Sequence, residues 1–302
     1  MNRELVIVSG KGGTGKTSIT ASFAALAESS ILCDADVDAA DLHLLLEPVV
    51  QKRSPFMGGS VARIRNQDCV ECGTCLELCQ FQAISGNFIV DSLACEGCGV
   101  CVDLCPERAI DFSIQQCGEW FVSDTRYGPM VHARLGIAEE NSGKLVSLVR
   151  QETKKLAEEH QYELILTDGP PGIGCPVIAA IGGATALVLI VEPTVSGLHD
   201  MQRVAELAEH FRVPVMLCVN KYDLNEEMTA RIEQYARQRN MRLLGRIPFD
   251  SMFVEAMVQG KSILEYAPAS SAAVALVDVW KNIQDSDVMR SSAVEDFLNV
   301  VQ

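Results

Sequence analysis

Eight of the twelve cysteines in this 302-residue sequence form two runs with the same internal spacing, C-x₂-C-x₂-C-x₃-C. The first run is Cys69, Cys72, Cys75 and Cys79, and the second is Cys95, Cys98, Cys101 and Cys105. This spacing is typical of thiolates that bind two [4Fe–4S] clusters, because three bind one cluster and the fourth reaches the other. One cluster is therefore predicted to take Cys69, Cys72, Cys75 and Cys105, and the other Cys95, Cys98, Cys101 and Cys79.

Zinc and disulfide bonds are the alternatives for these eight thiols. Zinc ribbons pair C-x₂-C units across a longer gap, whereas each run here has three closely spaced cysteines. The opening segment MNRELVIVSG contains no secretory apolar stretch, which argues against an extracellular disulfide framework. Pro106 follows Cys105, but Gln80 follows Cys79 where the pattern has proline. From this departure we expect the first cluster to be more exposed or more labile.

A second motif could bind phosphate groups. Residues 10–17 match G-x-x-x-x-G-K-[ST], after a predicted strand and before a predicted helix. The predicted nucleotide-binding residues of this loop are Gly10, Lys11, Gly12, Gly13, Thr14, Gly15, Lys16, Thr17 and Ser18. Glycines let backbone amides surround phosphate oxygens, and the start of a helix adds positive potential. Lys16 would neutralise the terminal phosphates, and the Thr17 hydroxyl would bind Mg²⁺.

The additional lysine of this loop points to a particular family. With Lys11, the loop has the form K-G-G-x-G-K-T. In this it resembles the MinD-like P-loop ATPases with a deviant Walker A motif, which include Mrp-type iron–sulfur carriers and the nitrogenase iron protein. The resemblance implies ATP as the nucleotide and a nucleotide-driven dimer. It also implies that Lys11 and Lys16 are catalytic. In the dimer, Lys11 would reach the nucleotide of the partner subunit.

Acidic residues follow two predicted strands. The resemblance makes Asp36 the first candidate to orient the attacking water and a candidate Mg²⁺ ligand, with Asp38 as the second candidate for catalysis. One of these two acids could instead cap the next helix. Residues 164–168 form an apolar run that ends at Asp168, which is typical of a Walker B motif, so Asp168 is predicted to hold Mg²⁺ through water. The segment Asp168–Gly172, D-G-P-P-G, is similar to the second switch of Mrp-type proteins.

Two further segments are candidates for contacts with the base. Asn220-Lys221-Tyr222-Asp223 has the form N-K-x-D, in which Asn220 could bind a purine edge and Lys221 lies beside it. The resemblance adds the loop Pro248-Phe249-Asp250 as a further nucleotide contact. The N-K-x-D form leaves GTP open, whereas the K-G-G-x-G-K-T loop favours ATP.

The intervening sequence predicts the elements that position these residues. Short apolar runs alternate with helical patterns, which predicts an α/β fold with a doubly wound, mostly parallel sheet. Strands are expected at 5–8, 31–34, 164–168, 187–191, 215–220 and 243–248, and a strand pair is expected within 118–135. Residues 35–50 are expected to be loop plus helix, and the tail from 285 to be loosely held. The ATPase domain would comprise 1–62 and 111–302, with a small ferredoxin-like α+β domain inserted at 63–110.

The remaining cysteines have different predicted environments. Cys33 and Cys218 lie in apolar runs and are expected to be small core residues, while Cys117 has no motif around it. Cys175 follows Asp168 by seven residues. The nitrogenase iron protein has a cluster-binding cysteine in this switch, so a cluster bridging two subunits at Cys175 is one alternative. A packed or redox-active thiol is the other, and it is favoured.

Composition and charge limit the partners. The formal net charge is −15, which disfavours nucleic acid and anionic membranes. Residues 169–191 lack charge, but prolines and glycines interrupt them, so a membrane span is not expected. The acidic end, 291–302, has no basic residue and so differs from the basic amphipathic membrane helix of MinD. A cytoplasmic protein is predicted.

Together these motifs predict an ATPase, ATP + H₂O to ADP + phosphate, that couples dimer switching to electron transfer through two [4Fe–4S] clusters. The resemblance implies a homodimer or a heterodimer with a paralogue, and a partner that is a metalloprotein or carries a metal–sulfur cofactor. The alternative is an Mrp-type carrier or scaffold that delivers clusters to apo-proteins. The sequence leaves open the electron donor and acceptor and the cluster potentials.

Overall fold

The structure is a computed structural model in which residues 2–136 and 142–290 are described. The chain forms two compact units. The larger unit comprises the described parts of Met1–Arg53, Phe121–Ala133 and Ser142–Gln302. The smaller unit comprises those of Ser54–Trp120 and Arg134–Asn141, so it includes the predicted insertion at 63–110 and extends beyond it on both sides.

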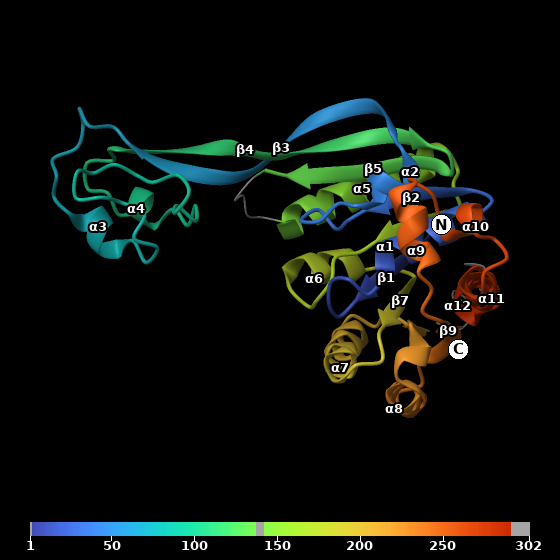
Figure 1. Ribbon diagram of the computed structural model, residues 1–302. Helices are drawn as coiled ribbons and strands as arrows, with labels where there is room; N and C mark the ends of the chain where they lie inside the picture. Colours follow the sequence, from blue (N-terminus) through green and yellow to red (C-terminus); the bar gives the residue numbers. More distant parts are fainter. Residues whose placement is uncertain (1, 137–141, 291–302) are drawn as a thin grey trace, which may run out of the picture. The chain divides into compact units, whose positions relative to one another are not determined.

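The described strands form one nine-stranded sheet (Figure 1). They are β1 (Arg3–Ser9), β2 (Ser30–Asp34), β3 (Val49–Ile64), β4 (Ile110–Thr125), β5 (Gly128–Leu135), β6 (Leu164–Asp168), β7 (Ala186–Val191), β8 (Val215–Asn220) and β9 (Arg242–Ile247). The strand order is β3-β4-β5-β2-β6-β1-β7-β8-β9, and the pairings from β5 through β2, β6, β1, β7 and β8 to β9 are parallel. The α/β fold with a mostly parallel sheet is confirmed.

Helices cover both faces of this sheet (Figure 1). The longer helices are α1 (Lys16–Leu26), α5 (Ser142–Glu159), α7 (Val195–His210), α8 (Glu226–Gln238) and α11 (Ser271–Gln284). The shorter ones are α2 (Leu42–Leu46), α3 (Thr74–Leu78), α4 (Val100–Asp103), α6 (Cys175–Ile181), η1 (Tyr222–Leu224), α9 (Met252–Val258), α10 (Ile263–Tyr266) and α12 (Asp287–Arg290). Helices α1, α2 and α11 pack together, as do α5 and α6.

Local sequence explains where several of these helices begin. The Thr194 hydroxyl accepts from the Gly197 amide at 2.9 Å, and the Asn225 side chain accepts from the Met228 amide at 2.9 Å. Both bonds satisfy amides that have no partner within the helix. One core cluster of the larger unit lies between the sheet and α1 and α11, where the rings of Phe23 and Trp280 have centroids 5.3 Å apart.

Two expectations differ from the structure. Residues 35–50 do include a helix, α2, but β3 then begins at Val49 and runs for 16 residues. Only two of the sixteen β3 residues are buried, so its sequence lacks the buried apolar pattern that reveals other strands. The tail is not loose up to Arg290, because α12 packs Met289 into the core and Ser286 is buried. Residues 291–302 lie outside the described residues.

The parallel register aligns the carboxyl ends of three neighbouring strands. Asp34 at the end of β2 lies opposite Asp168 at the end of β6, and Asp168 lies opposite Ile7 of β1. Open α/β sheets bind ligands beyond the carboxyl ends of their strands. The predicted phosphate loop and both predicted switch segments therefore leave the sheet at one edge.

Candidate functional site

The phosphate loop connects β1 to α1 and has a tightly enclosed backbone. Gly15 has φ +84°, and a Cβ there would lie 2.7 Å from the Asn220 amide nitrogen, so a larger residue would be strained and would collide. The Asn220 Nδ2 donates to the Thr14 carbonyl at 2.8 Å. The helix α1 begins at Lys16, so its free amides face the loop.

Lys16 lies at the centre of a buried charged cluster. Its side chain is 6% exposed, and its Nζ lies 2.8 Å from Asp168 Oδ1 and 3.2 Å from Asp36 Oδ2. Burial by itself would lower the pKa of Lys16, but these carboxylates outweigh it and raise the pKa. Two hydroxyls also bind Asp168. Thr17 donates to its Oδ2 at 2.8 Å, and Thr20 donates to its Oδ1 at 2.9 Å.

A third carboxylate, Asp34, adjoins this cluster. Asp34 is fully buried; its Oδ1 accepts from the Asp36 amide, while its Oδ2 has no hydrogen-bond partner. Burial and the charge of Asp168 raise the pKa of Asp34 well above its ordinary value. Burial likewise raises the pKa of Asp36, against the opposing effect of Lys16.

The carboxylates around Lys16 leave an excess of negative charge beside the phosphate loop. If all three are ionised, the cluster has two negative charges in excess of Lys16, and one of its oxygens lacks a partner. Mg²⁺ prefers oxygen ligands and retains water, which suits carboxylates beside a phosphate loop. The hydroxyl of Thr14 is also buried without a partner. The residues present therefore fit Mg²⁺ and a polyphosphate.

Sequence reasoning missed several members of this cluster. Asp34 ends the predicted strand 31–34, and its acidic terminal position was the available signal. Thr20 follows Lys16 by one helical turn, so it faces the same side of α1. Asp38, the second catalytic candidate, is exposed, whereas Asp36 is buried beside Lys16. This arrangement favours Asp36 over Asp38.

Lys11 and Lys221 share one acidic partner, Glu192. Lys11 Nζ lies 3.4 Å from Glu192 Oε2, and Lys221 Nζ donates to Glu192 Oε1. Glu192 immediately follows β7, so it lies at the same edge of the sheet as the phosphate loop. Sequence reasoning did not single out this residue, because no local motif includes it.

The two predicted base-contact segments are joined by a hydrogen bond. Asp223 Oδ1 accepts from the Phe249 amide at 2.7 Å, which links the N-K-x-D segment to the loop after β9. Asp250 Oδ1 accepts from the Met252 amide at 2.9 Å, and the Phe249 side chain is exposed. Asp223 thus has a structural partner, which accounts for its place in the motif without a contact to guanine.

The predicted second switch is bonded to the first strand. The Gly169 amide donates to the Ile7 carbonyl at 2.8 Å, and the Gly172 amide donates to the Ser9 carbonyl at 2.9 Å. Ser9 directly precedes the phosphate loop. A movement of the loop at 10–15 would therefore be transmitted to the backbone at 169–172 through these hydrogen bonds.

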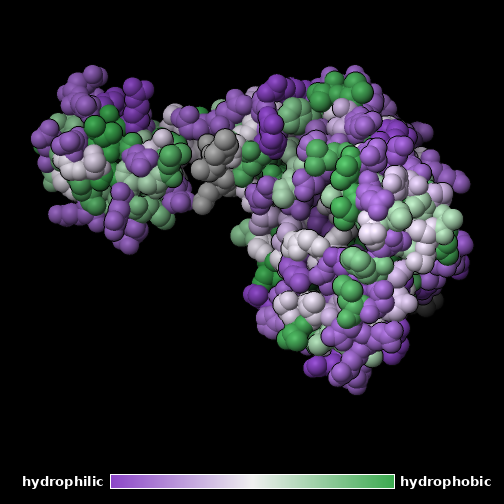
Figure 2. Space-filling view, in the orientation of Figure 1, coloured by the Kyte–Doolittle hydropathy of each residue, from purple (hydrophilic) through white to green (hydrophobic). Residues whose placement is uncertain are grey.

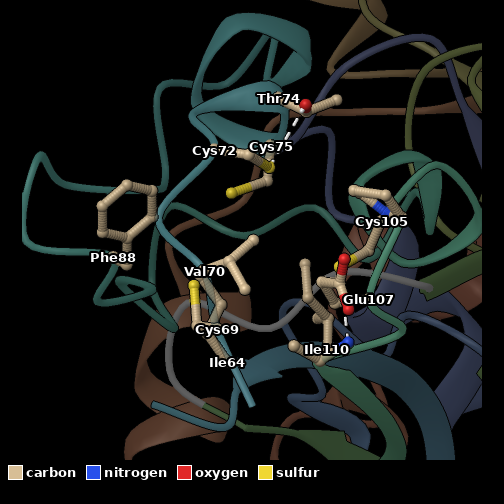
Figure 3. Close-up of a pocket in the computed structure, with 12 residues that line it drawn as sticks. Ile64, Cys69, Val70, Cys72, Thr74, Cys75, Phe88, Cys105, Glu107 and Ile110 are labelled. Atoms are coloured by element: carbon tan, nitrogen blue, oxygen red, sulfur yellow. Dashed lines mark hydrogen bonds between the residues drawn. The ribbon is translucent and has the colours of Figure 1, made fainter. Parts of the chain in front are cut away.

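The eight cysteines of the two runs line two separate cavities. One contains Cys69, Cys72, Cys75 and Cys105, and has about 350 Å³ of empty space that is partly open to solvent (Figure 3). The other contains Cys79, Cys95, Cys98 and Cys101, with about 320 Å³. Each cavity thus combines three cysteines of one run with the fourth of the other run.

The first cavity is otherwise mainly apolar. Ile64, Val70, Phe88 and Ile110 lie around its four thiols (Figure 3). Burial raises the pKa of Cys75, whereas the hydrogen bond with Thr74 lowers the pKa of the exposed Cys72. The second cavity is lined similarly by Ala62, Ile84, Val90 and Phe112, and burial raises the pKa of Cys101.

Four thiols line each cavity, which bears on the kind of metal site that they could form. Among residues 2–136 and 142–290, no three Cys, His, Asp or Glu side chains converge as around one metal ion. A zinc site needs four ligands at one ion, whereas four thiols spread around a cavity suit a cluster with one thiolate for each iron. Gln80, which stands where the pattern has proline, follows Cys79 of the second cavity.

Four cysteines lie outside the two runs, and two of them are core residues, as predicted. Cys33 and Cys218 are fully buried, and burial raises the pKa of each thiol to about 12. Cys117 is also buried. Cys175 is exposed at the first position of α6, so it is not a packed thiol.

On the face of the larger unit that Figure 2 shows, hydrophilic residues predominate and hydrophobic residues lie among them. Leu44 and Val258 are among the exposed apolar residues. None of the helices within the described residues is both long enough and apolar enough to span a bilayer. The uncharged stretch 169–191 instead forms a loop, the seven-residue α6 and the buried strand β7.

Comparison with known proteins agrees with the phosphate-loop geometry. The family model for the CobQ/CobB/MinD/ParA nucleotide-binding domain matches residues 5–263. An uncharacterized protein of Methanocaldococcus jannaschii is 36% identical over 225 residues, which are 74% of this chain and 79% of that protein. The chloroplastic MinD homologue of Arabidopsis thaliana is 25% identical over 97% of this chain and 78% of its own.

Solved structures share the fold. The cell-division ATPase MinD of Pyrococcus furiosus superposes with a TM-score of 0.59 at 19% identity, over 94% of this chain and 99% of its own. MinD of Pyrococcus horikoshii, solved with Mg-ADP, gives 0.58 at 20% identity, over 94% and 97%. The family match covers most of the sequence and contains the phosphate loop, Asp168 and Asn220. The chain belongs to the CobQ/CobB/MinD/ParA family of nucleotide-binding domains.

Proposed function

We propose that this protein is an ATPase that couples nucleotide-dependent dimer switching to one-electron transfer through two [4Fe–4S] clusters in its smaller unit. The acceptor would be a metalloprotein or the machinery that assembles its metal–sulfur cofactor. The observation that carries the proposal is the exchange of the fourth cysteine between two cavities, which is the ligand arrangement of a two-cluster protein.

The nucleotide chemistry rests on the charged cluster at the strand ends. Lys16 and the amides at the start of α1 would bind the phosphates, while Thr17 and Asp168 would hold Mg²⁺. Asp36 would orient the water that attacks the terminal phosphate, giving ADP and phosphate. Asn220, Lys221 and the loop 248–250 lie at the same edge and would contact the nucleoside.

Coupling between the two chemistries rests on chain connectivity. Asp36 and Asp38 precede α2 and β3, and β3 leads directly into the smaller unit. A change at Asp36 on nucleotide binding would therefore act on the segment that precedes the cysteines. When bound, [4Fe–4S] clusters supply one-electron transfer.

Substitution of Lys16 tests the nucleotide half. Lys16→Ala removes the cation that would meet the terminal phosphates, so kcat should fall about 100-fold or more. Phosphate release is measured, with Lys281→Ala as a control for loss of a lysine at an exposed site. Since Lys16→Ala leaves buried carboxylates without their cation, circular dichroism checks its fold, and Thr17→Ala provides a second variant. Unchanged turnover in a folded Lys16→Ala protein would refute the ATPase assignment.

Electron paramagnetic resonance (EPR) tests the electron-transfer half. Protein reconstituted with iron and sulfide without oxygen should contain about eight irons and, when reduced, show two interacting [4Fe–4S]⁺ signals. Addition of ATP and Mg²⁺ should change those signals in the wild type but not in Lys16→Ala. Iron-free protein after reconstitution would refute the cluster assignment, and signals that ignore nucleotide would refute coupling.

A carrier function is the second candidate, and the exposure of Cys72 and Cys98 favours it. Exposed thiolates are accessible to an acceptor's cysteines. Incubation of protein labelled with radioactive iron with an apo-ferredoxin distinguishes the two functions. Retention of label through many ATP turnovers supports electron transfer, whereas ATP-stimulated transfer of label supports a carrier.

A further inference from the structure

The two cysteine loops share a backbone feature but differ in the residue that follows it. Each run continues Cys-Gly-x-Cys, and the glycine is left-handed in both: Gly73 has φ 81° and ψ −11°, and Gly99 has φ 77° and ψ −9°. A short helix begins at the next residue in each loop. That residue is Thr74 in the first loop and Val100 in the second.

One backbone contact to a thiol is repeated in the two cavities. The Ala109 amide donates to Cys105 Sγ at 3.3 Å in the first cavity, and the Ala83 amide donates to Cys79 Sγ at 3.3 Å in the second. Each cavity is also lined by one glutamate. The repeated amide contact therefore does not distinguish the two sites.

The hydroxyl of Thr74 breaks this symmetry. Thr74 Oγ1 lies 3.4 Å from Cys72 Sγ (Figure 3). A metal-bound thiolate has no proton, so in the loaded protein the hydroxyl must be the donor. Val100 has no polar group on its side chain and cannot donate to Cys98 in the same way.

A donor to a ligand sulfur changes the reduction potential in a known direction. Reduction adds one negative charge to a cluster and its thiolates, and a donated hydrogen bond stabilises the more negative state. The hydroxyl of Thr74 should therefore raise the potential of the site that it contacts. Burial acts in the opposite direction, and Cys75 is more buried than its counterpart Cys101.

We propose that the Thr74 hydroxyl tunes the cluster bound by Cys69, Cys72, Cys75 and Cys105 to a higher reduction potential than the cluster of the second cavity. The proposal rests on the proposed function, since it requires that both clusters are present. An electron from a low-potential one-electron donor would then rest in the first cavity. Transfer between the cavities oxidises the second site as it reduces the first, with no bond or proton exchanged.

Reciprocal variants test the proposal in the full-length reconstituted protein. Thr74→Val removes the donor, Thr74→Ser keeps it, and Val100→Thr introduces it on a matched backbone. Potentials are measured by redox titration with dithionite, followed by EPR. Thr74→Val should lower the reduction equilibrium constant of one cluster about tenfold, or about 59 mV for one electron, and Thr74→Ser should restore it. Val100→Thr should raise the potential of the other cluster.

Each variant compares one cluster with itself, so the difference in burial cancels. Iron content and circular dichroism confirm that each variant is loaded and folded. Absence of iron in the wild type would refute the proposed function itself. Eight irons with no shift in Thr74→Val, or an equal shift in Thr74→Ser, would overturn only the role of Thr74. A first cluster whose potential lies below that of the second would overturn the proposed order.

Discussion

The lysine that defines the phosphate-loop variant is paired within its own chain. Glu192 contacts both Lys11 and Lys221, and its side chain is mostly buried. A lysine that reaches a partner's nucleotide, as the resemblance implies for Lys11, must first leave this carboxylate. Glu192 also places a negative charge near the predicted phosphate site. It is therefore expected to oppose nucleotide binding.

Substitution of Glu192 tests this competition. Glu192→Gln keeps the size of the side chain but removes its charge, which frees two lysines for phosphate. An ion pair of this kind contributes up to about 1 kcal/mol, so the Kd for ATP should fall about fivefold. Isothermal titration calorimetry measures the Kd. Glu206→Gln is the matched control, because Glu206 pairs with Arg239 on the outside of the unit. Weaker ATP binding by Glu192→Gln would contradict the expectation.

The strands β4 and β5 bury a histidine that should make the protein sensitive to acid. Burial, with a smaller effect from His43, lowers the pKa of His132 to about 4. Its ring stacks on Phe121 with centroids 5.0 Å apart, and Nε2 lies 2.9 Å from Ser123 Oγ. The neutral ring is thus favoured in the folded state, whereas the unfolded state gains a proton near the ordinary pKa of 6.5.

The sign of the pH dependence follows from these pKa values. Between about pH 6.5 and 4 the unfolded state binds more protons, so stability falls as the pH falls. His132 should reduce the free energy of unfolding by about 2 kcal/mol between pH 7.5 and 5. His132→Gln should lose less stability than the wild type over this range, as measured by urea unfolding. Substitution of the exposed His160 serves as the control, and equal acid losses in wild type and His132→Gln would count against this account.

The pattern of apolar residues along each strand explains which strands could be predicted from the sequence. Strands β6 and β8 each begin with a run of apolar residues and end in polar residues. Both were predicted at their observed bounds. The strand β3 was missed because only two of its residues are buried and its partner β4 lies beyond the cysteine runs. Its pairing is a long-range event that no local period encodes.

At the scale of the whole molecule, the two units differ greatly in their apolar cores. The larger unit has an extensive core around β1, α1 and α11. Around the cysteine runs, the buried cluster of the smaller unit comprises Ala62, Cys75, Ile84 and Ile110, with partly buried residues packed against it. So small a core rarely stabilises a fold alone, and metal binding commonly supplies the remainder.

Iron removal should therefore unfold the units unequally. Chelation of the reconstituted protein should make the smaller unit sensitive to trypsin at Arg63, Arg65 and Arg108, whereas the larger unit should stay protected and keep its affinity for ATP. Limited proteolysis with mass spectrometry and calorimetric ATP titration measure the two effects. Buffer without chelator is the control. Equal protection of the smaller unit with and without iron would show that its core suffices.

The sequence by itself determined the features that depend on spacing along the chain. The phosphate loop, the two cysteine runs and the alternation of strands and helices are local patterns, because neighbouring residues fix the backbone that they need. The tertiary structure decided which distant groups meet: Asp34 beside Asp168, Glu192 between Lys11 and Lys221, and Asp223 on the Phe249 amide. These contacts depend on strand order and register, which arise only when the sheet assembles from segments far apart in the chain.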